Sequence, residues 1–332
     1  MAVKLAINGL GRIGRQVLRA VFEEMRESEF DVIAINAPAA IETHLHLLKY
    51  DSVHGRFRGE IAAEGENLVI NGKKIPLTHE RDAAKVNWSG VDIVLECTGK
   101  FTKKADAMVH IRQGARKVLI SAPSPDADST IVFGVNNTAL KPEHTVISVG
   151  SCTTNCLAPV AKVLNDSLGI EQGFMTTIHS YTSDQNIHDG SHKDLRRARA
   201  AALSMVPTST GAAKALGLVL PELEGRLDGV AIRVPTPNVS LVDLKFTAAR
   251  ETTKEEINEL MKNAATSTAL KGVLAVNEEP LVSIDFNHHP ASSIFDATQT
   301  KVLNRRFCRV ASWYDNEWGF SNRMLDVAKL AA

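Results

Sequence analysis

The feature that most constrains the fold is a G-x-G-x-x-G sequence, Gly9-Leu10-Gly11-Arg12-Ile13-Gly14. It follows the apolar run Val3–Ile7, which is typical of a buried strand, and it opens a stretch with apolar residues at helical spacing. In that context the three glycines allow a tight turn, a close approach of a pyrophosphate, and close packing of helix on strand. N–H groups at the helix start then meet the phosphate charge. The sequence predicts a dinucleotide site, and the competing reading is a glycine-rich turn without a ligand.

The rest of the chain divides into two patterns. In the first half, short β-branched runs alternate with helical stretches, which predicts βαβ units and a parallel sheet. The expected strands after the first are Val32–Ile35, Val91–Leu95, Val118–Ile120, Ile131–Val135 and Val146–Val149. The second half has strand-like runs separated by few helices, which predicts a mixed, mostly antiparallel sheet. These runs are Met175–Ile178, Val230–Val234, Val239–Phe246, Val282–Phe286 and Cys308–Trp313, with helices at Lys254–Thr266 and Trp318–Leu330.

The end of the second strand lacks a residue that most dinucleotide sites have. A Rossmann fold commonly places Asp or Glu there, about 20 residues after the glycines, to bind the adenosine ribose hydroxyls. Here the strand continues Asn36-Ala37-Pro38. A carboxylate would favour NAD and repel the 2′-phosphate of NADP, and Ala37 does neither. The alternative is a tolerated loss in an enzyme that uses NAD.

A cysteine in a polar sequence marks the candidate nucleophile. Ser151-Cys152-Thr153-Thr154-Asn155-Cys156 lies between a predicted strand and a helical run, Leu157–Leu164. A cysteine at a helix start meets unpaired N–H groups and the positive end of the dipole, and both favour the thiolate. Cys156 lies one turn inside the helix and is expected to be structural. The two cysteines match metal-ligand spacing only loosely, and no second ligand cluster follows, so we expect no metal.

A base and anion-binding groups are found further along the chain. His179 directly follows the run Met175–Ile178 and begins a polar stretch. Catalytic residues are often found where a strand ends in this way. Arg233 lies in an apolar strand, where a guanidinium requires an anionic or hydrogen-bonding partner. Residues 192–199 carry a local charge of about +3, which suits a phosphate, a subunit interface or a solvated face. Thr208-Ser209-Thr210-Gly211 offers hydroxyls and a backbone N–H, suited to a phosphate or simply to a turn.

Charge and composition exclude several classes of protein. The 332 residues, enough for two domains, carry 38 Lys and Arg against 38 Asp and Glu. Without a net positive field, specific nucleic-acid binding is not expected. Four cysteines do not make a disulfide framework, and no apolar stretch is long enough for a membrane span. No secretory leader is visible, so we expect a cytoplasmic protein.

Four segments together resemble the phosphorylating glyceraldehyde-3-phosphate dehydrogenases, and the resemblance covers essentially the whole chain. The segments are Ile7–Arg15, Ser151–Cys156, Asp194–Ala201 and Trp313–Phe320. The resemblance implies an aldehyde oxidoreductase that converts D-glyceraldehyde 3-phosphate, NAD(P)+ and inorganic phosphate reversibly into 1,3-bisphosphoglycerate. Cys152 would form a thiohemiacetal and then a thioester, with His179 as its base.

The resemblance also implies an organisation and a set of binding residues. The change of pattern along the chain places a domain boundary near residue 150. Together with the resemblance, this predicts a Rossmann domain at residues 1–150, an α+β catalytic domain at 151–315, and a C-terminal helix at 316–332 packed back on the Rossmann domain. The resemblance implies a homotetramer in which a loop around residues 181–205 reaches a neighbour's cofactor. Substrate and phosphate contacts map onto Ser151, Thr153, Thr182, Arg197, Thr210, Gly211 and Arg233. Cofactor contacts map onto Gly9, Gly11, Arg12, Ile13, Gly14, Asn36, Ala37, Arg81, Thr98, Gly99, Ser121, Gly190, Ser191 and Asn316.

Two departures from the family's NAD-specific pattern concern the cofactor. NAD-specific members resemble one another in having Asp at the position of Ala37, and a Leu-Pro pair where this chain has Gly190-Ser191. Members that use NADP resemble this chain in the loop, where a small residue precedes Ser. Small residues leave room for the 2′-phosphate and a hydroxyl can bond to it, so we expect NADP to be accepted well.

Two other functions fit parts of this pattern. Erythrose-4-phosphate dehydrogenases share the glycine and cysteine motifs, but their loop usually departs from Ser180-Tyr181-Thr182. A catalytically idle binding protein on the same fold is the second alternative. Retention of Cys152, His179 and Arg233 argues against it.

Overall fold

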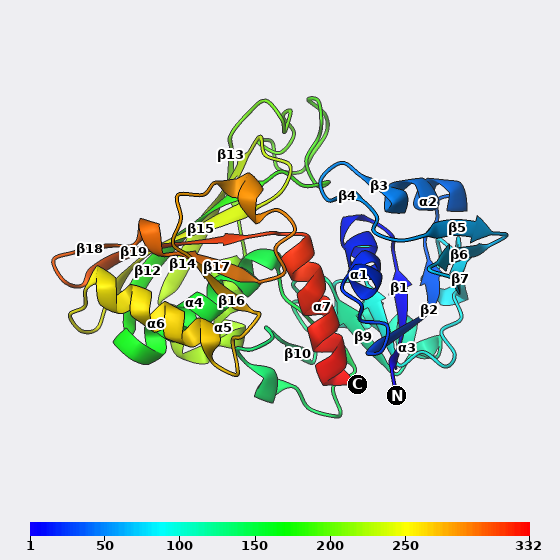
Figure 1. Cartoon of the computed structure of the whole chain (residues 1–332), viewed down its shortest axis with the longest axis horizontal. Coiled ribbons are helices and arrows are strands. Elements are labelled where there is room, and N and C mark those ends of the chain that lie inside the picture. Colours follow the sequence, from blue (N-terminus) through cyan, green and yellow to red (C-terminus); the bar gives the residue numbers. More distant parts are fainter. The chain divides into compact units, whose positions relative to one another are not determined.

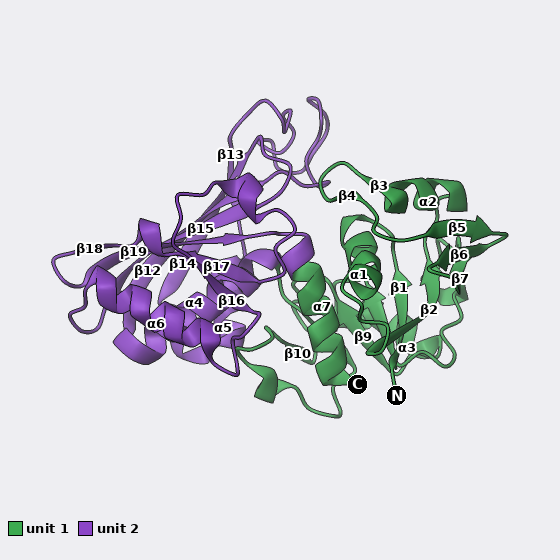
Figure 2. Ribbon diagram, viewed as in Figure 1, with its two compact units in different colours: residues 1–151, 320–332 green, residues 152–319 purple.

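The computed structural model describes residues 1–332 and divides them into two compact units. One unit consists of Met1–Ser151 together with Phe320–Ala332, and the other of Cys152–Gly319 (Figure 2). None of the helices has the length and apolar character needed to cross a bilayer.

The first unit is built on a nine-stranded sheet in the order β10-β11-β9-β8-β1-β2-β7-β6-β5 (Figure 1). All neighbours from β10 to β7 are parallel, and β7, β6 and β5 are antiparallel. The strands are β1 Val3–Asn8, β2 Phe30–Asn36, β5 Ile61–Glu64, β6 Asn67–Ile70, β7 Lys73–Thr78, β8 Ile93–Glu96, β9 Lys117–Ile120, β10 Ser129–Thr130 and β11 Val146–Ser148. The helices are α1 Arg12–Glu23, α2 Ile41–Lys49 and α3 Lys104–Arg112, and a two-stranded ribbon pairs β3 Tyr50–Asp51 with β4 Gly55–Arg56. The predicted parallel sheet is confirmed, and the antiparallel extension of residues 61–78 was not predicted.

The strand expected at Ile131–Val135 is wrong. The strand β10 beside β11 is limited to Ser129–Thr130, with one further backbone hydrogen bond from the Ile131 N–H to the Ser148 carbonyl at 2.9 Å, and the chain then turns. Side-chain amides take the backbone N–H groups that a ladder would need: Asn136 accepts from Val132 at 2.8 Å, and Asn137 accepts from Gly134 at 2.8 Å. Asn is favoured in turns for this reason.

Glycine is required at positions 9 and 14 for different structural reasons, and at position 11 it leaves open space. Gly9 has a φ of +98°, which L-residues with side chains rarely adopt. A Cβ on Gly14 would lie 1.9 Å from the carbonyl oxygen of Gly9, so helix α1 packs against the turn only without a side chain there. A Cβ on Gly11 would meet nothing within 4 Å, which leaves open space at the helix start. This cradle fits the close approach of a pyrophosphate.

We expect Gly14→Ala to lower the free energy of unfolding by about 3 kcal/mol, because the methyl group forces α1 away from its strand. Urea unfolding monitored by circular dichroism measures the loss. Gly11→Ala is the matched control and should change stability by less than about 1 kcal/mol, since its methyl group points into open space. Equal stabilities of the two variants would contradict this explanation of the motif.

The second unit contains an eight-stranded mixed sheet in the order β13-β14-β12-β15-β19-β17-β16, with β18 beside β19. Five of its seven strand pairs are antiparallel, and β12–β14 and β16–β17 are parallel. Its strands are β12 Ile170–Ser180, β13 Val206–Ser209, β14 Leu227–Val234, β15 Ser240–Ala248, β16 Leu274–Asn277, β17 Ser293–Asp296, β18 Lys301–Leu303 and β19 Phe307–Tyr314. Helices α4 Cys152–Leu168, α5 Ala212–Val219 and α6 Lys254–Thr266 lie on one side of the sheet (Figure 1). The predicted fold class, a Rossmann domain plus a mostly antiparallel α+β domain, is confirmed.

The strand expected at Val282–Phe286 is also wrong, because Ser283–Phe286 forms a 3-10 helix. The Asp285 carboxylate accepts a hydrogen bond from the Val282 N–H at 2.8 Å, and the Asp285 N–H donates to the Val282 carbonyl at 3.0 Å. Val282 and Ile284 are exposed, so no sheet face is available to bury their side chains.

The last helix, α7 Trp318–Ala331, supplies its residues from Phe320 onward to the first unit. There Asp326 accepts a hydrogen bond from Arg26 at 2.8 Å, and Lys329 pairs with Glu29 at 2.6 Å. These ion pairs attach the end of the chain to the loop that follows α1.

Candidate active site

Cys152 and His179 lie together in the second unit. Cys152 begins α4, and His179 lies near the end of β12. The Cys152 Sγ and His179 Nε2 are 3.6 Å apart. The His179 Nδ1 lies 2.6 Å from the Ser180 carbonyl oxygen, which can only accept a hydrogen bond, so Nδ1 carries the proton. The lone pair of Nε2 therefore faces the thiol, as a base requires.

Burial sets the protonation states of this pair. Burial, followed by the charge of Arg233, lowers the pKa of His179 to about 4, so the imidazole is neutral at neutral pH. Burial raises the pKa of the Cys152 thiol, while Thr153 and the charge of Arg233 lower it. The sequence predicts a thiolate held by the helix start, but burial outweighs that effect. The resting pair is a thiol beside a neutral base.

Arg233 lies next to His179 because β12 and β14 pair in parallel with these two residues in register. Its guanidinium donates to Thr182 Oγ1 at 2.6 Å and to Gln185 Oε1 at 3.3 Å, while its Nε is buried without a partner. These partners are neutral. The positive charge of this partly buried guanidinium therefore remains available to an anion beside His179.

Arg197 and the basic segment 192–199 have a different arrangement. Arg197 pairs with Asp184 at 2.6 Å and donates from Nε to Thr208 at 3.0 Å, while Arg199 pairs with Asp189 at 2.8 Å. Carboxylates from the neighbouring loop thus offset much of the local charge that the sequence shows.

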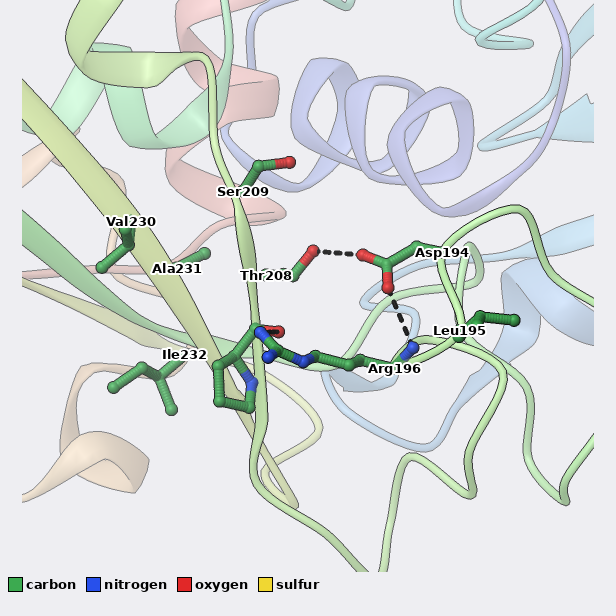
Figure 3. Close-up of a pocket in the computed structure, with 9 residues that line it drawn as sticks. Asp194, Leu195, Arg196, Thr208, Ser209, Val230, Ala231 and Ile232 are labelled. Atoms are coloured by element: carbon green, nitrogen blue, oxygen red, sulfur yellow. Dashed lines mark hydrogen bonds between the residues drawn. The ribbon is translucent and has the colours of Figure 1, made fainter.

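The basic segment also borders a groove of about 690 Å³. Asp194 and Thr208 are hydrogen-bonded at its edge, with Arg196 beside them (Figure 3). Neither Cys152 nor His179 lines this groove. The groove is therefore separate from the candidate nucleophile and base.

The remaining candidate phosphate residues lie at two helix starts. Thr210 and Gly211 precede α5, and the Thr210 hydroxyl accepts from the Ala212 N–H at 3.2 Å. Ser151 directly precedes Cys152 in the chain. The buried Thr153 uses its hydroxyl in a 2.8 Å hydrogen bond with the Tyr314 hydroxyl, so it is engaged within the protein.

Tyr314 is a residue of the site that sequence reasoning missed. It is buried, its hydroxyl also bonds Thr177 at 2.9 Å, and its ring lies edge-on to His179 with centroids 6.0 Å apart. It thereby joins the start of α4 to β12, the two elements that carry Cys152 and His179. The only sequence signal is its position in the segment Trp313–Phe320 that carries the family resemblance.

In the first unit, most of the expected cofactor residues gather at the carboxyl ends of parallel strands, where such folds bind ligands. They follow β1 (Gly9, Gly11, Arg12, Ile13, Gly14), β2 (Asn36, Ala37), β7 (Arg81), β8 (Thr98, Gly99) and β9 (Ser121). The open space at Gly11 and this shared edge fit a dinucleotide.

Two of these candidate cofactor residues, Asn36 and Arg12, use their side chains in contacts within the protein. The Asn36 amide bonds Asn8 at 2.8 Å and both backbone groups of Glu80 at 3.0 Å, so it joins strand ends. Arg12 forms a bidentate pair with Asp51 at 2.6 and 3.1 Å. Burial raises the pKa of Asp51, but Arg12 and two backbone N–H groups outweigh it and hold that pKa well below its usual range. The sequence did not reveal that Asp51 holds the Arg12 side chain.

Three further candidate cofactor residues belong to the second unit. Gly190 and Ser191 are exposed in the loop between β12 and β13, where the Gly190 N–H donates to the Ala198 carbonyl at 2.9 Å. Asn316 accepts from Ser180 at 2.8 Å and from Ser240 at 3.0 Å through its side-chain oxygen. No group of three or more His, Cys, Asp or Glu side chains is placed to hold a metal ion.

Comparisons with known proteins agree with both units. Residues 3–104 match the NAD binding domain of glyceraldehyde 3-phosphate dehydrogenase, and residues 151–316 match the C-terminal domain of the same enzyme. The chain belongs to the glyceraldehyde-3-phosphate dehydrogenase family. It is 60% identical over 330 residues to glyceraldehyde-3-phosphate dehydrogenase of Xanthobacter flavus, covering 99% of this chain and 98% of that protein. Those of Cereibacter sphaeroides and Geobacillus stearothermophilus are 58% and 55% identical, over 98% and 99% of their lengths.

Membership in the glyceraldehyde-3-phosphate dehydrogenase family confirms the resemblance found in the sequence. It also supports a nicotinamide dinucleotide site in the first unit, since the matched model is that of an NAD-binding domain. The assignment of Cys152 and His179 as nucleophile and base rests on their geometry and stays a prediction.

Proposed function

We propose that the chain oxidises D-glyceraldehyde 3-phosphate, with NAD or NADP and inorganic phosphate, to 1,3-bisphosphoglycerate. The observation that carries the proposal is the 3.6 Å contact between the Cys152 thiol and a His179 ring whose Nδ1 proton is fixed by the Ser180 carbonyl. A thiol with an adjacent, oriented base is the arrangement of covalent catalysis. The family membership points to the same substrate class.

The chain's own residues account for the covalent steps. The Cys152 sulfur adds to the aldehyde carbon while its proton moves to His179 Nε2, giving a thiohemiacetal. The Cys152 backbone N–H and the protonated His179 stabilise the oxygen on which negative charge develops. NAD or NADP, which the residues after β1, β2, β8 and β9 would hold, would supply the acceptor for the hydride that leaves the thiohemiacetal carbon. Inorganic phosphate then attacks the thioester carbon, the C–S bond breaks to release the acyl phosphate, and His179 returns its proton to the Cys152 sulfur.

Phosphate recognition is assigned to two groups of residues. Arg233 and Thr182, joined by a 2.6 Å hydrogen bond beside His179, would bind the substrate phosphate. Ser151, Thr153, Thr210 and Gly211 would bind the attacking phosphate, and Arg197 would contact the substrate. Because Arg197 is held by Asp184 and Thr208, its role would require a rearrangement of those contacts.

The two domains would have separate roles in an enzyme assembled from four subunits. Residues 1–150 would bind the cofactor and residues 151–315 the substrate, with the segment 316–332 returning to the cofactor-binding domain. The enzyme would be a cytoplasmic homotetramer whose loop 181–205, with Gly190 and Ser191, reaches a neighbour's cofactor. The exposed apolar side chains Ile187, Leu195, Leu203 and Met205 in this region suit burial between subunits.

Ala37, Gly190 and Ser191 support good acceptance of NADP, because none of them repels a 2′-phosphate and Ser191 offers a hydroxyl. We expect kcat/KM for NADP to lie within about 100-fold of that for NAD, a limit of about 2.7 kcal/mol. Ala37→Asp should lower kcat/KM for NADP by about 10-fold or more and leave NAD activity nearly unchanged, since a carboxylate repels only the extra phosphate. Equal losses with both cofactors would contradict the assignment of Ala37.

Steady-state assays with two aldehydes test the proposed reaction. Reduction of the nicotinamide should be fast with glyceraldehyde 3-phosphate, slow with erythrose 4-phosphate, and should stop after one acylation when phosphate is omitted. A preference for erythrose 4-phosphate would assign the chain to the sister activity. Stoichiometric thiol alkylation without loss of turnover, or no turnover at all, would favour an idle binding protein.

A further inference from the structure

Two histidines lie close to Ala37, and neither belongs to the machinery described above. His79 directly follows β7, and its Nδ1 lies 3.1 Å from the Ala37 carbonyl oxygen. His44 lies in α2 with only 6% of its surface exposed, and neither of its ring nitrogens has a hydrogen-bond partner. Buried polar atoms without a partner are rare in proteins, so the surroundings of His44 require an explanation.

The position of these histidines in the fold indicates which part of a ligand they meet. Ala37 directly follows β2, and the residue at this point of a Rossmann fold borders the adenosine ribose of the dinucleotide. The 2′ position of that ribose carries a hydroxyl in NAD and a phosphate in NADP. A phosphate monoester at this point would therefore lie among the histidines that surround Ala37.

The groups facing His79 favour its charged form. Glu66 accepts a hydrogen bond from Nε2 at 2.7 Å, and this contact raises the pKa of His79, while partial burial lowers it less. The Glu66 side chain is 71% exposed, so it is free to turn into solvent when a stronger anion arrives. Glu80 and Arg81, next along the chain, are the other charged residues adjoining His79.

His44 is complementary to His79. Burial lowers the pKa of His44, the nearby Ala37 carbonyl opposes that effect, and the charges of Arg15 and His79 lower the pKa further. His44 is therefore a neutral ring with one N–H to donate, and it lies close to the Ala37 and Ala39 carbonyls. A phosphate dianion would provide both an acceptor for His44 and a counter-charge for His79.

We infer that His79, supported by His44, is a pH-dependent contact for the 2′-phosphate of NADP. The inference rests on the proposed acceptance of NADP and adds the residues that distinguish the two cofactors. At pH values below the pKa of His79, its ring is a cation and attracts the phosphate. Above that pKa the ring is neutral and its single N–H is held by the Ala37 carbonyl, so it offers the phosphate no donor. Preference for NADP therefore falls as the pH rises, whereas NAD affinity stays level.

Calorimetric titration of the full-length enzyme with NADP+ and NAD+ between pH 7 and 9 tests the inference without turnover. The 2′-phosphate stays almost fully ionised in this range, since its pKa is about 6. For the wild type, the ratio of NADP to NAD affinity should fall about fivefold across the range, the size expected for one charge-assisted hydrogen bond. His79→Gln should weaken NADP binding about fivefold at pH 7, flatten the pH dependence, and leave NAD affinity within about twofold.

Three further variants separate charge from structure. Glu66→Gln should move the fall in NADP affinity to lower pH, because the contact that raises the pKa of His79 is lost. His44→Leu should weaken NADP binding about threefold at every pH, because it removes a neutral donor. His144→Gln, a histidine before β11 and away from this cluster, is the matched control and should match the wild type for both cofactors.

The outcomes distinguish this inference from the proposal beneath it. If His79→Gln binds NADP with the affinity and pH dependence of the wild type, the role of the histidines is overturned and the proposed acceptance of NADP stands. NADP affinity more than about 100-fold below NAD affinity at every pH overturns both the inference and the proposed acceptance of NADP. Parallel losses of NAD and NADP binding in His79→Gln would show a structural effect and also overturn the inference.

Discussion

Cys152→Ser is expected to lower kcat for the oxidation of glyceraldehyde 3-phosphate by about 10⁴-fold or more. The serine hydroxyl is a far weaker nucleophile near neutral pH, and an oxygen ester is a poorer acyl donor to phosphate than a thioester. His179 Nε2 remains in place to accept a proton, so the loss reports the sulfur itself. A stopped-flow measurement of the first turnover should show no burst of nicotinamide reduction.

Cys156→Ser is the matched control for this variant. Cys156 lies one helical turn further along α4, is fully buried, and contacts Ser293 and the Ser312 carbonyl. Burial raises the pKa of its thiol to about 12, so it stays protonated and inert. We expect this control to retain at least about one tenth of wild-type turnover. Activity preserved in Cys152→Ser and lost in Cys156→Ser would reverse the assignment of the nucleophile.

His179→Asn should lower kcat by about 10³-fold, the usual contribution of a positioned general base. The asparagine side chain retains polarity but cannot accept the thiol proton at the Nε2 position. Cofactor affinity should be unchanged, which equilibrium titration would show. A loss below about tenfold would indicate that another group takes the proton.

The pH dependence of stability gives an independent readout for His179. Its pKa is about 4 in the folded protein and about 6.5 in an unfolded chain, so the unfolded state binds more protons between these values. Wild-type stability should therefore fall by on the order of 3 kcal/mol from this group as the pH drops from 6.5 to 4. Urea unfolding at several pH values should show a smaller fall for His179→Asn. Identical pH slopes for the two proteins would contradict the burial of a neutral imidazole.

Local patterns in the sequence were sufficient for much of the fold. The alternation of apolar runs with helical spacing predicted the parallel sheet, and Lys254–Thr266 forms a helix with those bounds. The two wrong strands, Ile131–Val135 and Val282–Phe286, have apolar residues of strand type but lie beside Asn136, Asn137 and Asp285. Those side chains bond the backbone locally, and this competition is not visible in hydrophobicity alone.

Sequence by itself determined the elements that depend on neighbours in the chain: the glycine turn before α1, the absence of a carboxylate after β2, and Cys152 at a strand-to-helix turn. Only the tertiary structure decided which distant groups meet. The register of β12 with β14 places Arg233 beside His179, and Tyr314 from β19 joins Thr153 to Thr177. Burial made His179 a neutral base and kept Cys152 a thiol, reversing the charge state that the helix start favours. Desolvation and strand register depend on segments far apart in the chain, so no local pattern contains them.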